Sequence, residues 1–289
     1  MYNKLRVAII GTGNIGTDLL VKVMRSENLV CTLFAGRNKN SSGIEKAKKL
    51  GIPVSYDGAN ALIEYQDTYD IVADCTSAQS HSTHWRICSD LGKSIIDLTP
   101  AKLGKFAVPA IDDESFAKSI VKNTNMITCG GQTSVPIVYA ISRVNPVEYV
   151  EVVSTIASLS AGPATRENLD EYVETTQQAL KIFSGAEESK AILILNPADP
   201  PINMLTTIYA KIETPEIDKI RASVESMVKS VQKYVPGYEL VVHPTIKEGI
   251  VFTTVRVMGA GDYLPQYAGN LDIINCAAIA VMEKYANGE

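Results

Sequence analysis

The sequence has little charge of either sign and no long apolar run. Charged residues make up 20% of its 289 residues, and the formal net charge is −5. This weak negative charge disfavours nucleic acid or an anionic membrane as the main partner, and we expect neither. No apolar stretch approaches the length that spans a bilayer. The N-terminal MYNKLRVAII lacks the layout of a secretory signal, so we expect a cytoplasmic protein.

Cysteine and histidine are also scarce. The five cysteines form no CxxC pair and no group with metal-ligand spacing. We therefore expect neither a disulfide framework nor a metal centre. His81 and His84 are one helical turn apart, but no third ligand is near them in the sequence. An exposed helix face is favoured over a metal pair.

Short apolar runs alternate with helical patterns through the first 130 residues. This alternation predicts βαβ units and a parallel sheet with helices on both faces. We place an N-terminal Rossmann domain, which binds a dinucleotide, at residues 1–130. The expected strands are Leu5–Ile10, Leu29–Ala35, Tyr69–Cys75, Ser94–Leu98 and Asn125–Cys129.

The pattern changes after residue 130. Long runs rich in β-branched residues at Val147–Leu159, Tyr238–Ile246 and Ile250–Met258 predict strands with few crossovers. They favour an α+β domain at residues 131–265, with a mixed or mostly antiparallel sheet and helices on one face. Residues 266–289 contain an Ala- and Ile-rich segment. We expect it to form a C-terminal helix that packs back on the Rossmann domain.

A glycine pattern, GTGNIG, follows the first expected strand and opens a helix. This context is typical of dinucleotide binding, because the glycines permit a tight turn and let the pyrophosphate approach the helix N-terminus. After the second strand, where NAD-binding proteins carry an acid, the sequence has Arg37. Arg37 is either a partner for the 2′-phosphate of NADP or a solvated cation. The sequence thus predicts NAD or NADP as cofactor.

Cys129 stands apart from the other cysteines. It ends an expected strand, Gly130 and Gly131 follow it, and a helix is expected to begin at Thr133. A helix N-terminus lowers the pKa of a thiol and favours the reactive thiolate. From position alone, a nucleophile and a buried packing residue are equally good interpretations. The segment SAGPATREN, Ser160–Asn168, is expected to be a loop, either ordinary or close to a ligand.

Eight blocks along nearly the whole chain carry a family resemblance. They are VAIIGTGNIGTDL, Thr76–Ala78, Ile96–Ala101, TCGGQ, SAGPATREN, Asn196–Pro201, YVPGY and YLPQYAGNLDI. Together they resemble the acylating acetaldehyde dehydrogenases, the partners of 4-hydroxy-2-oxovalerate aldolase in aromatic degradation. The resemblance implies an oxidoreductase that converts a small aldehyde, CoA and NAD into acyl-CoA and NADH. A homodimer through the second domain and an aldolase partner likewise follow only from the resemblance.

The resemblance also implies roles for residues. Cys129 would carry the acyl group as a thioester, and Asn168 and Leu169 would line the aldehyde pocket. The nucleotide-binding segments fall on Thr12–Ile15, Ser160–Asn168 and Asn270. With the glycine pattern and Arg37, the expected cofactor-binding residues are Gly11, Thr12, Gly13, Asn14, Ile15, Gly16, Arg37, Ser160, Ala161, Gly162, Pro163, Ala164, Thr165, Arg166, Glu167, Asn168 and Asn270.

The sequence departs from the family at three places. A family Asp that has been proposed to assist proton transfer is Thr206 here, which leaves the general base open. The acid after the second strand is replaced by Arg37-Asn38, and the segment between Tyr238 and Val251 is short. The acyl group and the direction also stay open, including use as an acyl-CoA reductase.

Two alternative functions remain. The first is a phosphorylating semialdehyde dehydrogenase, of similar two-domain build, that uses phosphate in place of CoA. The second is an inactive nucleotide-binding partner of an aldolase. Loss of the family Asp favours the inactive partner, whereas retention of TCGG and SAGP argues against it.

Overall fold

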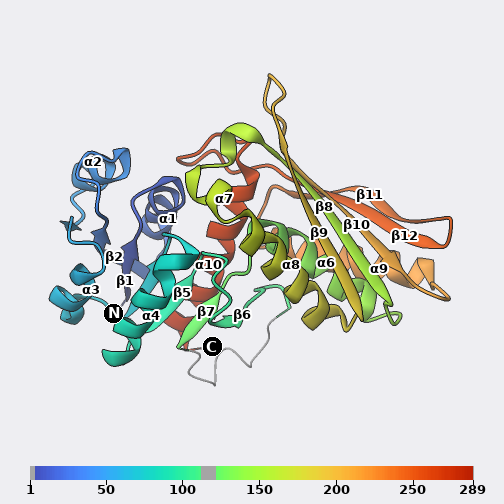
Figure 1. Cartoon of the computed structure of the whole chain (residues 1–289), viewed down its shortest axis with the longest axis horizontal. Helices are drawn as coiled ribbons and strands as arrows, with labels where there is room; N and C mark the ends of the chain where they lie inside the picture. The colour runs from blue at the N-terminus through green and yellow to red at the C-terminus, as the bar shows by residue number, and fades with distance from the viewer. Residues whose placement is uncertain (1–3, 112–121, 289) are drawn as a thin grey trace. The chain divides into compact units, whose positions relative to one another are not determined.

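The computed structural model describes residues 4–111 and 122–288, which form two compact units. Within these residues, the first unit comprises 4–107, 122–126 and 275–288. The second unit comprises 108–111 and 127–274. Figure 1 shows the whole chain coloured from the N- to the C-terminus.

The first unit is built on a seven-stranded parallel sheet. Its strand order is β3-β2-β1-β4-β5-β7-β6, and every described pairing between neighbours is parallel. Apolar side chains of β1, β2 and β4 are buried along most of each strand, as expected for a sheet covered on both faces. The strands are β1 Leu5–Ile10, β2 Leu29–Ala35, β3 Val54–Ser55, β4 Ile71–Asp74, β5 Ser94–Asp97, β6 Lys105–Phe106 and β7 Asn123–Asn125.

Helices connect these strands. They are α1 Asn14–Arg25, α2 Ser42–Lys49, α3 Asn60–Glu64, α4 Ala78–Asp90 and the short 3₁₀ helix η1 Gln66–Thr68. Ser41 and Ser77 cap α2 and α4, because each hydroxyl accepts a hydrogen bond from a backbone N–H of the first turn. The C-terminal helix is α10, Gly269–Asn287. Its Asn275 amide donates to the Ile15 carbonyl and to Asp18 on α1.

The second unit contains a five-stranded mixed sheet in the order β11-β12-β10-β8-β9. The pair β8–β9 is parallel, and the other pairs are antiparallel. The strands are β8 Tyr149–Ala157, β9 Glu188–Asn196, β10 Met204–Lys211, β11 Tyr238–Lys247 and β12 Ile250–Val257. The central strand β10 was not among the expected strands, although its MLTTIYAK sequence contains strand-forming Thr, Ile and Tyr and alternates buried with partly exposed residues.

Helices α6 Cys129–Ser142, α8 Leu169–Ser184 and α9 Ile217–Gln232 cover one face of this sheet (Figure 1). The 3₁₀ helix η2, Ser158–Ser160, and the one-turn helix α7, Pro163–Glu167, lie between β8 and α8. The expectation of a loop at Ser160–Asn168 is therefore corrected in part. The predicted fold class is confirmed: a Rossmann-type α/β domain, a second domain with a mixed sheet, and a C-terminal helix.

The expected strand at Asn125–Cys129 is wrong. β7 ends at Asn125, and Ile127 has a φ of 62°, in the left-handed region where an extended strand cannot continue. Helix α6 then begins at Cys129, not at Thr133. The Thr128 hydroxyl accepts a hydrogen bond from the Gly131 N–H and caps this earlier start.

None of the helices in residues 4–111 and 122–288 is both long and apolar enough to cross a membrane.

Candidate active site

Cys129 is the first residue of α6, and its side chain is half-buried. Its thiol donates a hydrogen bond to the hydroxyl of Tyr172 on α8, with 3.7 Å between Sγ and Oη. Asn168, expected in the aldehyde pocket, lies one turn before Tyr172, whose N–H donates to the Asn168 carbonyl. The second unit therefore brings the candidate nucleophile close to the start of α8.

A chain of buried hydroxyls continues from Tyr172. The Ser154 hydroxyl on β8 lies nearby, because a Cβ placed on Gly130 would meet both Tyr172 Oη and Ser154 Oγ. Ser154 Oγ in turn lies 3.0 Å from Thr206 Oγ1 on β10. Tyr172, Ser154 and Thr206 are each at most 6% exposed. Sequence reasoning missed Tyr172 and Ser154, because they are distant from Cys129 in the sequence and belong to no motif that includes it.

The two glycines after Cys129 have a packing reason. A Cβ on Gly130 would overlap with the Tyr172 hydroxyl, and a Cβ on Gly131 would overlap with the Ile127 side chain. Gly130 therefore lets the tyrosine reach the sulfur. Within this unit the space beside both glycines is filled by side chains of the protein itself.

The pKa of the Cys129 thiol differs from the expectation. Burial raises the pKa to about 11, against the lowering effects of hydrogen bonds with Tyr172 and with the Gly130 N–H. Cys129 lies at a helix N-terminus as expected, although the helix begins at Cys129 itself and not at Thr133. The predicted lowering of the thiol pKa is wrong. Removal of the thiolate from water outweighs these hydrogen bonds.

The glycine pattern lies between β1 and α1 in the first unit. Gly11 has a φ of 107°, and a Cβ there would lie 2.5 Å from the Cys75 carbonyl oxygen. A Cβ on Gly16 would overlap with the Gly11 carbonyl. At Gly13, by contrast, a Cβ meets no described atom within 4 Å. Gly11 and Gly16 are thus required by the close packing of the turn. Gly13 leaves open space beside the N-terminus of α1, where a pyrophosphate fits.

The other expected cofactor residues are divided between the units. Thr12, Asn14, Ile15 and the exposed Arg37 belong to the first unit, and Ser160–Asn168 and Asn270 to the second. The side chains of Pro163 and Ala164 lie outside the described part of the structure.

Several members of the second-unit segment support its own backbone. Ser160 is buried and donates to the Ala157 carbonyl, and Arg166 donates to the carbonyls of Ser158 and Ala161. Asn270 differs from these residues: it is 1% exposed, and its side-chain oxygen has no hydrogen-bond partner among the described residues. A buried acceptor without a partner fits a ligand that donates a hydrogen bond.

The expectation that His81 and His84 form an exposed helix face is wrong. Both are buried, and each Nδ1 lies within 2.9 Å of the Asp74 carboxylate at the end of β4. His81 Nε2 lies 3.4 Å from Asp97. The ring nitrogen of His81 and the carboxylate oxygens of Asp74 and Asp97 that could bind a metal ion lie within 4.8 Å of one another. Both ring nitrogens of His81 face carboxylates, an arrangement that suits a protonated imidazole.

Electrostatics separate the two buried acids. Burial opposes ionisation of Asp74, but hydrogen bonds from His81 and His84 prevail and lower its pKa to about 2. Burial raises the pKa of Asp97 to about 6, against the attraction of His81. For His81, burial favours the neutral ring, but the two carboxylates outweigh it and raise the pKa.

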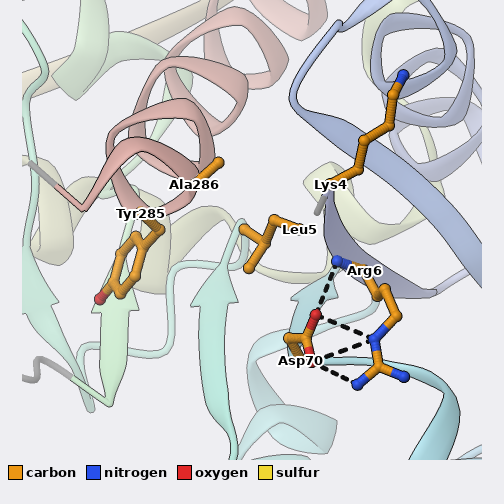
Figure 2. A pocket seen from close by; sticks show the side chains of 6 residues that line it. All are labelled: Lys4, Leu5, Arg6, Asp70, Tyr285 and Ala286. Atoms are coloured by element: carbon orange, nitrogen blue, oxygen red, sulfur yellow. Dashed lines mark hydrogen bonds and ion pairs between the residues drawn. The ribbon is translucent and has the colours of Figure 1, made fainter. Parts of the chain in front are cut away.

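An open pocket at the start of β1 is a weaker candidate. It is lined by Lys4, Leu5, Arg6, Asp70, Tyr285 and Ala286. Figure 2 shows Arg6 and Asp70 turned toward each other, with 2.6 Å between Nη2 and Oδ1. The pocket lies at the amino end of the strand, whereas ligands of open parallel sheets bind at the carboxyl ends. Cys129 and the glycine turn remain the better candidates.

Known proteins resemble this chain over nearly its full length. An acetaldehyde dehydrogenase of Pectobacterium atrosepticum is 61% identical over 98% of this chain and 96% of its own length. The acetaldehyde dehydrogenases of Spirochaeta aurantia and Geobacillus stearothermophilus are 51% and 46% identical, each over 98% of this chain. The matched regions make up 95% and 97% of the lengths of these two relatives.

Two further comparisons agree with the division of the fold. The profile of the family described as "Prokaryotic acetaldehyde dehydrogenase, dimerisation" matches residues 129–265. The structure of aspartate semialdehyde dehydrogenase II from Vibrio cholerae has a TM-score of 0.67 over 99% of both chains, at 13% identity, and so shares the fold. On the full-length identities, this chain belongs to the acetaldehyde dehydrogenase family.

Proposed function

We propose that the protein is a CoA-acylating aldehyde dehydrogenase. It converts a small aldehyde, CoA and NAD or NADP into acyl-CoA and the reduced nucleotide through a thioester on Cys129. The observation that carries this proposal is the half-buried thiol at the start of α6, beside the Tyr172 hydroxyl, in a chain of this family. The reductive direction, from acyl-CoA to aldehyde, uses the same groups.

The residue steps begin at the sulfur. Cys129 Sγ bonds to the aldehyde carbon, and the carbonyl oxygen gains a proton, which gives a thiohemiacetal. Loss of a hydride and of the hydroxyl proton leaves a thioester on Cys129. The thiol of CoA then adds to the thioester carbon and displaces Cys129 as acyl-CoA forms. Asn168 and Leu169 are the proposed aldehyde-pocket residues.

The nicotinamide nucleotide, when bound, supplies the hydride acceptor. The open space at Gly13 fits a pyrophosphate, and Gly11, Thr12, Asn14, Ile15 and Gly16 form the turn and the helix start around it. In the second unit, the resemblance assigns nucleotide binding to Asn270, whose side-chain oxygen is buried, and to the segment Ser160–Asn168.

Replacement of the nucleophile tests the reaction. Cys129→Ala should abolish turnover with the fold intact, because no thioester can form. Cys129→Ser should be nearly as inactive, since a serine hydroxyl ionises far less readily than a thiol. Turnover is measured as nucleotide reduction with acetaldehyde and CoA. When the wild-type protein is incubated with acetaldehyde and the oxidised nucleotide but without CoA, mass spectrometry should show the acyl group on the Cys129 peptide.

A control removes another sulfur. Cys31→Ala, in the buried strand β2, should keep its turnover per folded molecule. Retained activity in Cys129→Ala would identify a different nucleophile and refute the proposal.

The same assay separates the alternatives. A phosphorylating semialdehyde dehydrogenase would need phosphate in place of CoA, and an inactive aldolase partner would reduce no nucleotide under any condition. The fold shared with a semialdehyde dehydrogenase does not favour phosphate. We therefore expect turnover with CoA and none with phosphate alone.

The cofactor preference depends on Arg37. The side chain is exposed just after β2, where it can pair with a 2′-phosphate. We expect NADP to be used at least comparably to NAD, and Arg37→Asp to shift the preference toward NAD by about tenfold. The measurement is kcat/KM for both nucleotides. Strong rejection of NADP by the wild type, with Arg37→Asp unchanged, would leave Arg37 as a surface cation.

We further propose a homodimer through the second unit, supported by the dimerisation family whose profile matches residues 129–265. A 4-hydroxy-2-oxovalerate aldolase partner and a role in aromatic degradation rest on the resemblance alone, and a cytoplasmic location rests on the N-terminal sequence.

A further inference from the structure

The Cys129 sulfur contacts a hydroxyl that no family assignment above includes. Tyr172 Oη lies 3.7 Å from Sγ. The tyrosine is 6% exposed, so its hydroxyl is held against the sulfur by packing within the second unit. Gly130 leaves the space that this approach needs, because a Cβ there would overlap with the hydroxyl.

The hydroxyl is fixed from two further sides. Burial raises the pKa of the Tyr172 hydroxyl well above its ordinary value, and the Ser154 hydroxyl and the Gly130 N–H act to lower it. Both lie nearby, since a Cβ on Gly130 would meet Tyr172 Oη and Ser154 Oγ. Ser154 Oγ is in turn 3.0 Å from Thr206 Oγ1, and both residues are almost fully buried. The chain from Cys129 through Tyr172 and Ser154 to Thr206 consists of one thiol and three hydroxyls, without a carboxylate.

We propose that Tyr172 is a catalytic residue whose hydroxyl accepts a hydrogen bond from the resting Cys129 thiol and donates one to the thiolate. Ser154 and Thr206 are positioning residues that hold the hydroxyl. This proposal rests on the proposed function in so far as Cys129 is the nucleophile.

The chemistry requires only a reversal of one hydrogen bond. A phenol O–H is both donor and acceptor, so the same contact suits either form of the sulfur. The thiol proton passes to water, the S–H bond breaks, and its electron pair stays on sulfur. Tyr172 keeps its own proton and donates it as a hydrogen bond to the thiolate. Such a bond favours the charged form of a buried group, which burial alone disfavours.

The test is the reactivity of the sulfur in the full-length protein without substrates. Cys129 is alkylated with iodoacetamide between pH 6 and pH 10, and the modified Cys129 peptide is quantified by mass spectrometry. Tyr172→Phe should lower the rate at pH 8 by about three- to tenfold, because a smaller fraction of the sulfur is thiolate.

The matched control is Tyr238→Phe. Tyr238 is equally buried, and its hydroxyl donates to the Thr133 carbonyl of α6 without any recorded contact with the sulfur. This variant should alkylate at the wild-type rate. Equal rates for Tyr172→Phe and the wild type across the pH range would overturn the proposal. So would an equal decrease in both variants, since that would reflect loosened packing of α6.

Ser154→Ala provides a second route if Tyr172→Phe does not fold. It removes one partner of the tyrosine hydroxyl and should lower the rate in the same direction by a smaller factor. An unchanged or raised rate in a folded Ser154→Ala protein would also overturn the proposal. Because alkylation needs no aldehyde, CoA or nucleotide, it is read independently of the Cys129→Ala turnover test.

Discussion

At the scale of single residues, the buried carboxyls of Asp74 and Asp97 in the first unit differ in pKa because they have different partners. Asp74 accepts hydrogen bonds from two histidine rings. Asp97 accepts hydrogen bonds from the Thr99 N–H and the Asn125 amide, and lies 3.4 Å from His81 Nε2. The pKa of the Asp74 carboxyl is lowered from 3.8 to about 2. Ionised Asp74 therefore stabilises the first unit above pH 4, and this contribution is lost as the pH falls through 2.

The expected size of this effect is about 2 kcal/mol, because each pKa unit corresponds to about 1.4 kcal/mol. Asp74→Asn should destabilise the first unit, and its free-energy gap to the wild type should shrink by about that amount between pH 5 and pH 2. Trp85, the single tryptophan, lies on α4 and packs against the hydrophobic core of the first unit, so its fluorescence follows unfolding of this unit in urea. If the difference in unfolding free energy between wild type and Asp74→Asn stays constant with pH, the histidines do not lower the pKa of Asp74.

Sequence patterns identified some residues of the candidate site and missed others. Cys129 and the glycine turn could be predicted, because their neighbours in the chain create the environment. Tyr172 and Ser154 could not, since they come from α8 and β8 and meet Cys129 only in the folded unit. The burial of His81 and His84 was missed for the same reason: it depends on which face of α4 packs over Asp74.

At the scale of elements, the strands that were predicted well are continuous apolar runs, such as β1 and β2. Element ends were predicted less well. The start of α6 is fixed by the hydroxyl of Thr128 and the left-handed backbone of Ile127, neither of which alters the apolar pattern. β10 was missed although MLTTIYAK has strand-forming residues and the alternation of a strand; it pairs with β8 and β12 at the centre of the sheet.

The turn between β1 and α1 allows a clean test of nucleotide binding. Gly13 has an ordinary extended backbone, and a side chain there meets no described atom. Gly13→Val should keep the wild-type thermal midpoint and weaken binding of the dinucleotide by tenfold or more, because the branched side chain fills the pyrophosphate space. Titration calorimetry with NAD and NADP measures the affinity.

The comparison at this turn is Gly16→Ala. A Cβ at Gly16 would overlap with the Gly11 carbonyl, so this variant should lose stability itself. Undiminished affinity in folded Gly13→Val would move the nucleotide away from this turn.

At the scale of the whole molecule, the second sheet has a second face, opposite the one that α6, α8 and α9 cover. Alternate residues of β10 and β12 on this face are partly exposed, and the rings of Tyr209 and Phe252 are 6.3 Å apart there. If a second copy covers this face, Tyr209→Glu should place charge in the interface and raise the fraction of monomer. Analytical ultracentrifugation at several concentrations measures this change.

Ser226→Glu, on the exposed side of α9, adds the same charge outside the sheet and should leave the assembly unchanged. A wild type that sediments as a monomer at all concentrations would refute the proposed homodimer.

The interrupted first unit has a consequence for synthesis on the ribosome. Its glycine turn and parallel strands emerge early, but Asn275 and Glu283, whose side chains hydrogen-bond with Asp18 and Asn28, emerge only after the second unit. About 150 residues of the second unit are translated in between, which takes roughly 8 to 30 seconds at 5–20 residues per second. During that interval the nascent parallel sheet lacks part of its cover, and chaperones that bind exposed apolar surface have their main opportunity to act on this chain.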